Sequence, residues 1–127
     1  MQNEDDSQYA ISFWKTDFGL SATQIEEYAF EEYPAGGKFF MSHDCESILL
    51  VLEDKESRYL KECRLVSTRS LDQEPVSVDI SSLKIRAAKF VKAYFAWNTH
   101  IFIFTKKELI VLNTKYNTDQ RQHFQIS

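Results

Sequence analysis

Residues 45–60 read CESILLVLEDKESRYL, and residues 97–112 read WNTHIFIFTKKELIVL. Each segment runs from polar residues into a β-branched and aromatic stretch, crosses a short charged turn and enters a second apolar stretch. This pattern is typical of a β-hairpin. The hairpins echo one another at an offset of 52 residues, from Cys45 to Trp97. Repeats of roughly this length are typical of propellers, solenoids and arrays, because one unit cannot bury its apolar face alone.

Further strands are expected on both sides of the hairpins. Alternation of apolar and polar side chains predicts strands near residues 8–14 and 38–42, and the hairpins supply strands at 47–53, 58–66, 101–105 and 109–113. Residues 83–97 fit both a helical face and a strand face, and their β-rich flanks favour the strand. The continuous apolar runs ILLVL and HIFIF predict strands that are covered on both faces. We therefore expect a mainly β protein of short antiparallel hairpins, arranged like propeller blades or as a compact sheet or barrel.

One acidic helix is predicted near residues 22–33. Ser21 and Gln24 have the spacing of a capping box, which pairs two otherwise unsatisfied amides at a helix start. Ile25, Tyr28 and Ala29 recur at helical intervals, and Pro34 with the following glycines ends the segment. The acidic side chains expected on its solvent side are Glu26, Glu27, Glu31 and Glu32.

The composition fits one folded domain. The chain has 127 residues, of which 43% are hydrophobic, so a single core is expected to form. We expect a disordered terminus at residues 1–7 and a single β-rich domain at 8–127, with a polar connection at 67–82.

The acidic start and the lack of a long apolar run predict an intracellular protein, cytoplasmic or nuclear, without a membrane partner. Cys45 and Cys63 fit buried thiols in a reducing compartment, or a disulfide if the protein is exported.

Charge is distributed unevenly along the chain. Residues 1–79 carry seventeen acidic and seven basic side chains, whereas residues 80–127 carry two acidic and eight basic ones. If the basic residues between Asp79 and Glu108 share one face, they attract an acidic partner or nucleic acid. The alternative is that the two halves neutralise each other within one fold.

The sequence contains no pattern that is typical of an active site. His43, Asp44 and Cys45 are consecutive, and neighbours on a strand point to opposite faces, which is poor geometry for nucleophilic catalysis. The segment Gly36-Gly37-Lys38 lacks the spacing of a phosphate-binding loop. A zinc site is not expected either, because no second pair of ligands accompanies His43 at metal-finger spacing. We expect a non-enzymatic protein without a metal or cofactor.

Residues 96–113, AWNTHIFIFTKKELIVLN, combine a small residue, a polar pair with histidine, an apolar strand, a threonine turn and a second strand. Residues 11–21, ISFWKTDFGLS, combine an aromatic pair, a polar loop and a glycine. Both segments resemble the repeat of the regulator-of-chromosome-condensation family of seven-bladed β-propellers. The matching positions are Ala96, Trp97, His100, Thr105 and 109–112, together with Phe13, Trp14, Asp17 and Gly19. The resemblance implies blade-like hairpins that form a fragment of a larger propeller or a small domain resembling a blade pair.

These features favour a protein-recognition module or adaptor. Its expected partner is another protein, basic or otherwise charged. The predicted binding residues are Glu26, Glu27, Tyr28 and Glu31 on the acidic helix, and Lys84, Arg86, Lys89, Lys92 and Tyr94 on the basic segment. One alternative is a small β domain that binds single-stranded nucleic acid, because these lysines alternate with aromatic rings suited to base stacking. Another is an acidic inhibitor or immunity protein that masks a basic active site.

Overall fold

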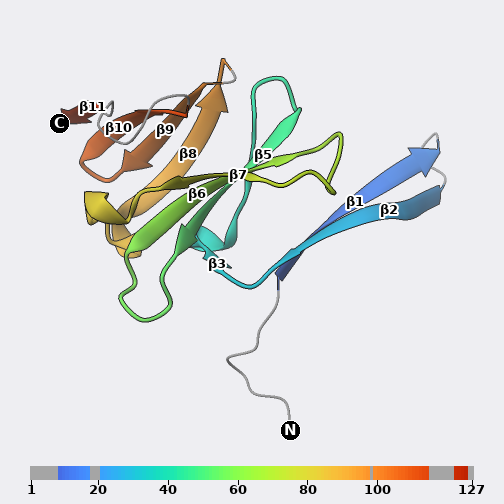
Figure 1. The fold of residues 1–127 in the computed structure, drawn as a ribbon, viewed down its shortest axis with the longest axis horizontal. Coiled ribbons are helices and arrows are strands. Elements are labelled where there is room, and N and C mark those ends of the chain that lie inside the picture. Colours follow the sequence, from blue (N-terminus) through green and yellow to red (C-terminus); the bar gives the residue numbers. More distant parts are fainter. Residues whose placement is uncertain (1–8, 18–20, 98, 115–121, 126–127) are drawn as a thin grey trace, which may run out of the picture. The chain divides into compact units, whose positions relative to one another are not determined.

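A computed structural model describes residues 9–17, 21–97, 99–114 and 122–125, and it is mainly β (Figure 1). The chain divides into two compact units, with the boundary between Glu32 and Tyr33. Each unit is therefore described by itself. The terminus predicted at residues 1–7 and Gly19 lie outside the described residues. Among the described residues, no helix is long and apolar enough to cross a membrane.

The first unit is a β-hairpin, and the acidic helix predicted near residues 22–33 is wrong. Strand β1 (Tyr9–Asp17) pairs antiparallel with β2 (Ser21–Phe30). Tyr28 and Phe30 alternate on one face of β2, and their rings stack at 5.7 Å. The same face carries Ile11 opposite Tyr28 and Tyr9 opposite Phe30. Aromatic and β-branched side chains favour this pleated, cross-strand packing, which outweighs the helical spacing.

The second unit begins with a four-strand-wide antiparallel sheet, called here the first sheet. Its edge strand is interrupted, since β3 (Tyr33–Pro34) and β4 (Phe40–Met41) both pair with the same side of β5 (Ser47–Glu53). The 3-10 turn η2 (Ala35–Gly37) separates them, with positive φ at both glycines. Strands β6 (Leu60–Ser67) and β7 (Val76–Asp79) complete the sheet in chain order. The polar segment predicted as a connection at 67–82 therefore includes β7.

The second sheet is a four-stranded meander in chain order. It consists of β8 (Phe90–Ala96), β9 (His100–Thr105), β10 (Glu108–Asn113) and β11 (Gln122–Gln125). Residues 83–97, for which a strand was favoured, form a strand only from Phe90, after the 3-10 turns η3 (Ser81–Leu83) and η4 (Ala87–Lys89). The pairing of β8 with β9 shifts register between Phe90 and Lys92, as in a β-bulge.

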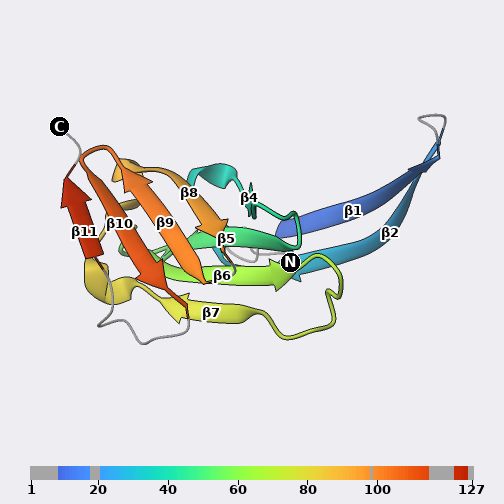
Figure 2. The ribbon, with the colours of Figure 1, turned by 90° about the horizontal axis from the view of Figure 1, so that it is seen from above.

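The two sheets pack face to face and enclose one apolar core (Figure 2). The first sheet contributes Leu49, Val51, Cys63 and Leu65 from β5 and β6. The second sheet contributes Ala93, Phe95, Ile101, Ile103, Ile110 and Leu112 from β8, β9 and β10. These side chains alternate along their strands, as expected where one face of each sheet meets the other.

The two strands predicted to be covered on both faces differ. In β5 every residue from Ile48 to Leu52 is at most 1% exposed, so that prediction is confirmed. In β9, Ile101 and Ile103 are buried, but Phe102 and Phe104 remain partly exposed. The prediction is therefore wrong for β9, because the alternation in HIFIF places isoleucine toward the core and phenylalanine on the opposite face.

Candidate interaction surface

The outer face of the second sheet is apolar and aromatic. Register places Tyr94, Phe102 and Val111 opposite one another, and Lys92, Phe104 and Leu109 form the neighbouring row. All six side chains point away from the core cluster, and all are partly or fully exposed. We call this surface, together with Trp97 and His100, the aromatic face.

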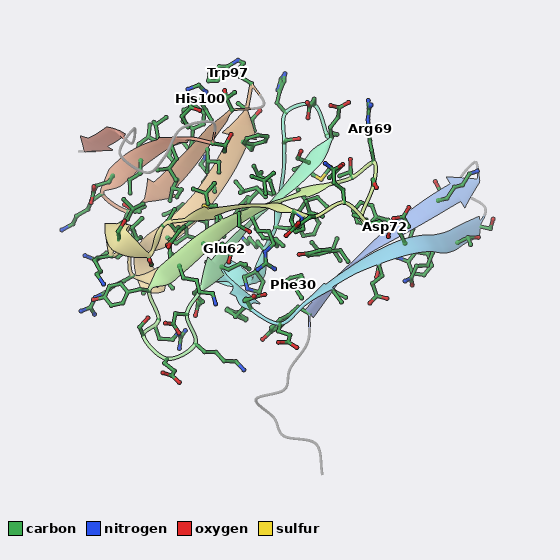
Figure 3. The ribbon with its side chains drawn as sticks, in the orientation of Figure 1. Phe30, Glu62, Arg69, Asp72, Trp97 and His100 are labelled. Atoms are coloured by element: carbon green, nitrogen blue, oxygen red, sulfur yellow. The ribbon has the colours of Figure 1, made fainter. Side chains whose placement is uncertain are left out.

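The turn between β8 and β9 adds the most exposed ring of this surface. Trp97 has a φ of 56°, a left-handed conformation that is uncommon for a bulky residue, and its side chain is 74% exposed. Its ring lies 5.9 Å from that of His100 and 5.8 Å from that of Phe102, edge to face in both contacts. Figure 3 shows Trp97 and His100 together at this end of the sheet. The indole therefore extends the aromatic face while remaining open to solvent.

A groove of about 450 Å³ follows this surface. Its lining consists of His43, Lys92, Ala93, Tyr94, Ala96, Trp97, Phe102 and Phe104. At one end, His43 Nδ1 and Tyr94 Oη lie 3.1 Å apart, within hydrogen-bonding distance. At the other end, Lys92 Nζ lies 5.1 Å from the centre of the Phe104 ring, in cation–π range. The groove thus combines an apolar floor with polar groups at its ends, as ligand and partner sites commonly do.

The turn beside the groove is fixed by a carboxylate. Asp44 Oδ1 accepts hydrogen bonds from the Ser42 hydroxyl at 2.7 Å and from the Glu46 N–H at 3.0 Å. These bonds, the Ser42 bond first, lower the pKa of Asp44. The ionised form is favoured because it accepts both bonds. His43 is thereby held at the groove by a turn that has its own hydrogen-bond network.

The predicted acidic binding residues do not form one surface. Glu26 and Glu27 are consecutive on β2, so their side chains point to opposite faces of the hairpin. The Gln24 amide donates to Glu27 Oε2 at 3.3 Å, and Tyr28 is half-buried against Phe30. Glu31 follows the end of the strand. A helix would have aligned these carboxylates, whereas the strand separates them.

The predicted basic residues are also dispersed. Lys84 ends η3 in a left-handed conformation, and Lys89 lies in η4. Arg86 stacks over the Tyr59 ring at 5.7 Å and lines a separate polar groove of about 490 Å³ that contains the Glu53–Arg58 ion pair. Of the predicted binding residues, Lys92 and Tyr94 lie on the aromatic face.

The cysteine and histidine candidates do not assemble a catalytic site. Both thiols are free, with Cys45 exposed and Cys63 buried. Burial, and to a smaller extent the neighbouring Glu62 charge, raise the pKa of Cys63 to about 12, so this thiol stays protonated at neutral pH. His43 contacts Tyr94 rather than Cys45 in the hydrogen bonds that the structure gives it. Among the described residues, no group of three metal-ligating side chains lies close enough to hold an ion.

Sequence reasoning did not select His100, Phe102, Phe104, Leu109 or Val111 as binding residues. The sequence pattern that could have identified them is the strict alternation of isoleucine and phenylalanine in β9, which is typical of a strand with two different faces. Comparisons with protein-family models, with curated proteins and with solved structures give no match.

Proposed function

We propose that this protein is a non-enzymatic recognition module that binds a protein partner through the aromatic face. The observation that carries the proposal is the exposed row of rings across β8 and β9, with Trp97 74% and Tyr94 38% exposed. Contiguous exposed apolar surface of this kind marks interaction sites on folded proteins. Tryptophan and tyrosine are also enriched among the residues that dominate binding energy.

The arrangement of the sheets supports a blade-like architecture for the module. Two antiparallel meanders, each four strands wide, follow one another in chain order and pack face to face. Consecutive blades of a β-propeller have this arrangement. We therefore retain the similarity to the regulator-of-chromosome-condensation repeat as part of the proposal, for the architecture alone.

Binding is tested by comparing what the full chain retains from extracts of its native host with what a Trp97→Ala/Phe102→Ser variant retains. We expect a protein partner whose apparent affinity falls at least about tenfold in the variant, because both rings anchor the contact. The matched control is Val76→Ser, which removes a 52% exposed apolar side chain from the first sheet. Equal retention by all three proteins would contradict the proposal.

Single-stranded nucleic acid is a second candidate ligand, favoured by one contact. Lys92 Nζ lies over the Phe104 ring, which places a cation for phosphate beside a ring for base stacking. Titration of fluorescent DNA and RNA oligomers at low salt measures this binding. The candidate requires an affinity that falls with rising salt and falls again in Lys92→Gln. Binding that responds to neither change would remove it.

A further inference from the structure

The hydrogen-bonded pairs of the two sheets align the sheets residue by residue. The pair Ser47 and Ser67 begins the β5–β6 hairpin, and the pair His100 and Asn113 begins the β9–β10 hairpin. One residue beyond each pair, an equivalent backbone hydrogen bond joins the two strands of the hairpin. The Thr68 N–H donates to the Glu46 carbonyl at 2.9 Å, and the Thr114 N–H donates to the Thr99 carbonyl at 2.7 Å. The alignment therefore follows from pairing geometry and not from residue similarity.

This alignment makes the aromatic face equivalent to the packing face of the first sheet. Leu49 pairs with Leu65 as Phe102 pairs with Val111, and Val51 pairs with Cys63 as Phe104 pairs with Leu109. The four residues from the first sheet lie in the core against the second sheet. Their four counterparts carry side chains of the same apolar kind, yet they are only partly buried.

The first strands of the two sheets agree with this assignment. Phe40 pairs with Leu49, and Tyr94 pairs with Phe102. Phe40 packs against the core cluster, whereas its counterpart Tyr94 is exposed on the aromatic face. Three successive strands of the second sheet thus present a face whose equivalent in the first sheet is covered by another sheet.

The packing between the two sheets also indicates what kind of surface would be complementary to the aromatic face. The face that covers Leu49 and Val51 carries four aliphatic side chains, Ile101, Ile103, Ile110 and Leu112, together with Ala93 and Phe95. The equivalent face of the first sheet carries Ile48, Leu50 and Val66, each at most 1% exposed. Among the described residues, a second copy of this chain therefore has no exposed aliphatic sheet face that could cover the aromatic face.

We infer that the partner of the aromatic face is an antiparallel β-sheet of another protein, packed face to face through isoleucine, leucine and valine side chains. This inference rests on the proposed function and specifies the occupant of the site. This contact would resemble the packing between the two sheets of this protein. The partner sheet would cover the aromatic face of the second sheet in the same way as the second sheet covers the inner face of the first sheet. Sheet-on-sheet packing buries alternate residues of several adjacent strands at once. Binding of a single helix or peptide would instead follow one line across the surface.

The test uses the full chain with the photo-crosslinking residue p-benzoylphenylalanine in place of Phe102 or Val111. These positions lie on adjacent strands in the middle of the aromatic face. The same substitution at Val76, an exposed apolar position on the first sheet, is the control. Circular dichroism melts establish that each variant is folded. Irradiation in native host cells is followed by mass spectrometry of the crosslinked peptides.

We expect a crosslink yield at positions 102 and 111 that exceeds the yield at 76 by at least about tenfold. The captured residues should alternate along the partner chain at a spacing of two and come from neighbouring strands. Capture at spacings of three and four would identify a helix and overturn the sheet inference, while the protein-binding function would stand. Capture of a second copy of this chain would likewise overturn the inference. Yields at 102 and 111 no higher than at 76 would overturn both.

Discussion

The two sheets share one hairpin pattern but differ in what covers them. In the first sheet, β5 is buried on both faces, from Ile48 to Leu52. In the second sheet, β9 is buried on one face and presents Phe102 and Phe104 on the other. Both strands are apolar throughout, so hydrophobicity alone does not distinguish a core strand from a strand with an open face. The difference indicates that a strand can have the composition of a core element and still carry an interaction surface.

The largest expected effect is a difference in stability between substitutions at equivalent residues of the two sheets. Leu49→Ala should lower the free energy of unfolding by about 2–5 kcal/mol, because it leaves a cavity in a fully buried site. Phe102→Ala, at the equivalent position on the partly exposed face, should cost only about 1 kcal/mol. Urea unfolding followed by circular dichroism measures both values. A loss for Phe102→Ala as large as that for Leu49→Ala would remove the distinction between the two faces.

Thiol reactivity sharpens the comparison at another equivalent pair, Cys63 and Leu109. In a Cys45→Ser background, Cys63 should resist maleimide labelling at neutral pH, because it is buried and its pKa is raised to about 12. Adding Leu109→Cys should create one readily labelled thiol on the aromatic face. Mass spectrometry of the native protein counts the labels, and labelling in urea provides the control in which every thiol reacts. Rapid native labelling at Cys63 would contradict the burial of this face.

A smaller effect concerns Asp44, in the turn that precedes β5. The pKa of Asp44 is lowered in the folded state, so its ionisation stabilises the fold above the unfolded pKa of about 3.9. That contribution is lost as the pH falls through the lower, folded pKa. Wild type should therefore be more stable than Asp44→Asn near pH 6, and the difference should shrink below about pH 4. Thermal melts across this range measure it.

Asp79→Asn provides the companion variant for the acid experiment. The pKa of Asp79 is lowered by the Ser81 hydroxyl and then by the Ser81 N–H, so the sign of its pH dependence is the same. A difference from wild type that stayed constant or widened toward low pH would contradict the assigned role of either carboxylate.

Much of the strand content could be predicted from the sequence. Strand β5 has the predicted bounds, and β9 and β10 differ from prediction by one residue at their starts. Alternation and β-branched residues determine these strands locally, so sequence patterns are sufficient to find them. The strand predicted near residues 8–14 is found as β1, but β2 was predicted as a helix, because capping-box spacing is also compatible with a strand and the cross-strand ring contacts that decide between them are not local.

The candidate site was harder to predict because it depends on register. The sequence echo has an offset of 52 residues, whereas the paired strands align Ser47 with His100, an offset of 53. Ser47 lies two residues after Cys45, whereas His100 lies three residues after Trp97, and this accounts for the difference. A slip of one residue moves every side chain to the other face of a strand. The echo therefore identified the hairpins but paired the core isoleucines of β9 with the wrong face of β5.

One backbone hydrogen bond joins the two sheets directly. The His43 N–H donates to the Phe95 carbonyl at 3.3 Å, so the end of β4 approaches β8 to hydrogen-bonding distance. Strand β5 also approaches β8, and close backbone approaches are fewer between the other strands of the two sheets, because the core side chains lie between them. Layers that meet at one margin and diverge from it are related by rotation about that margin rather than by parallel displacement. A further layer added by the same operation would continue to turn in the same sense, so such a stack would be finite and would tend to close on itself.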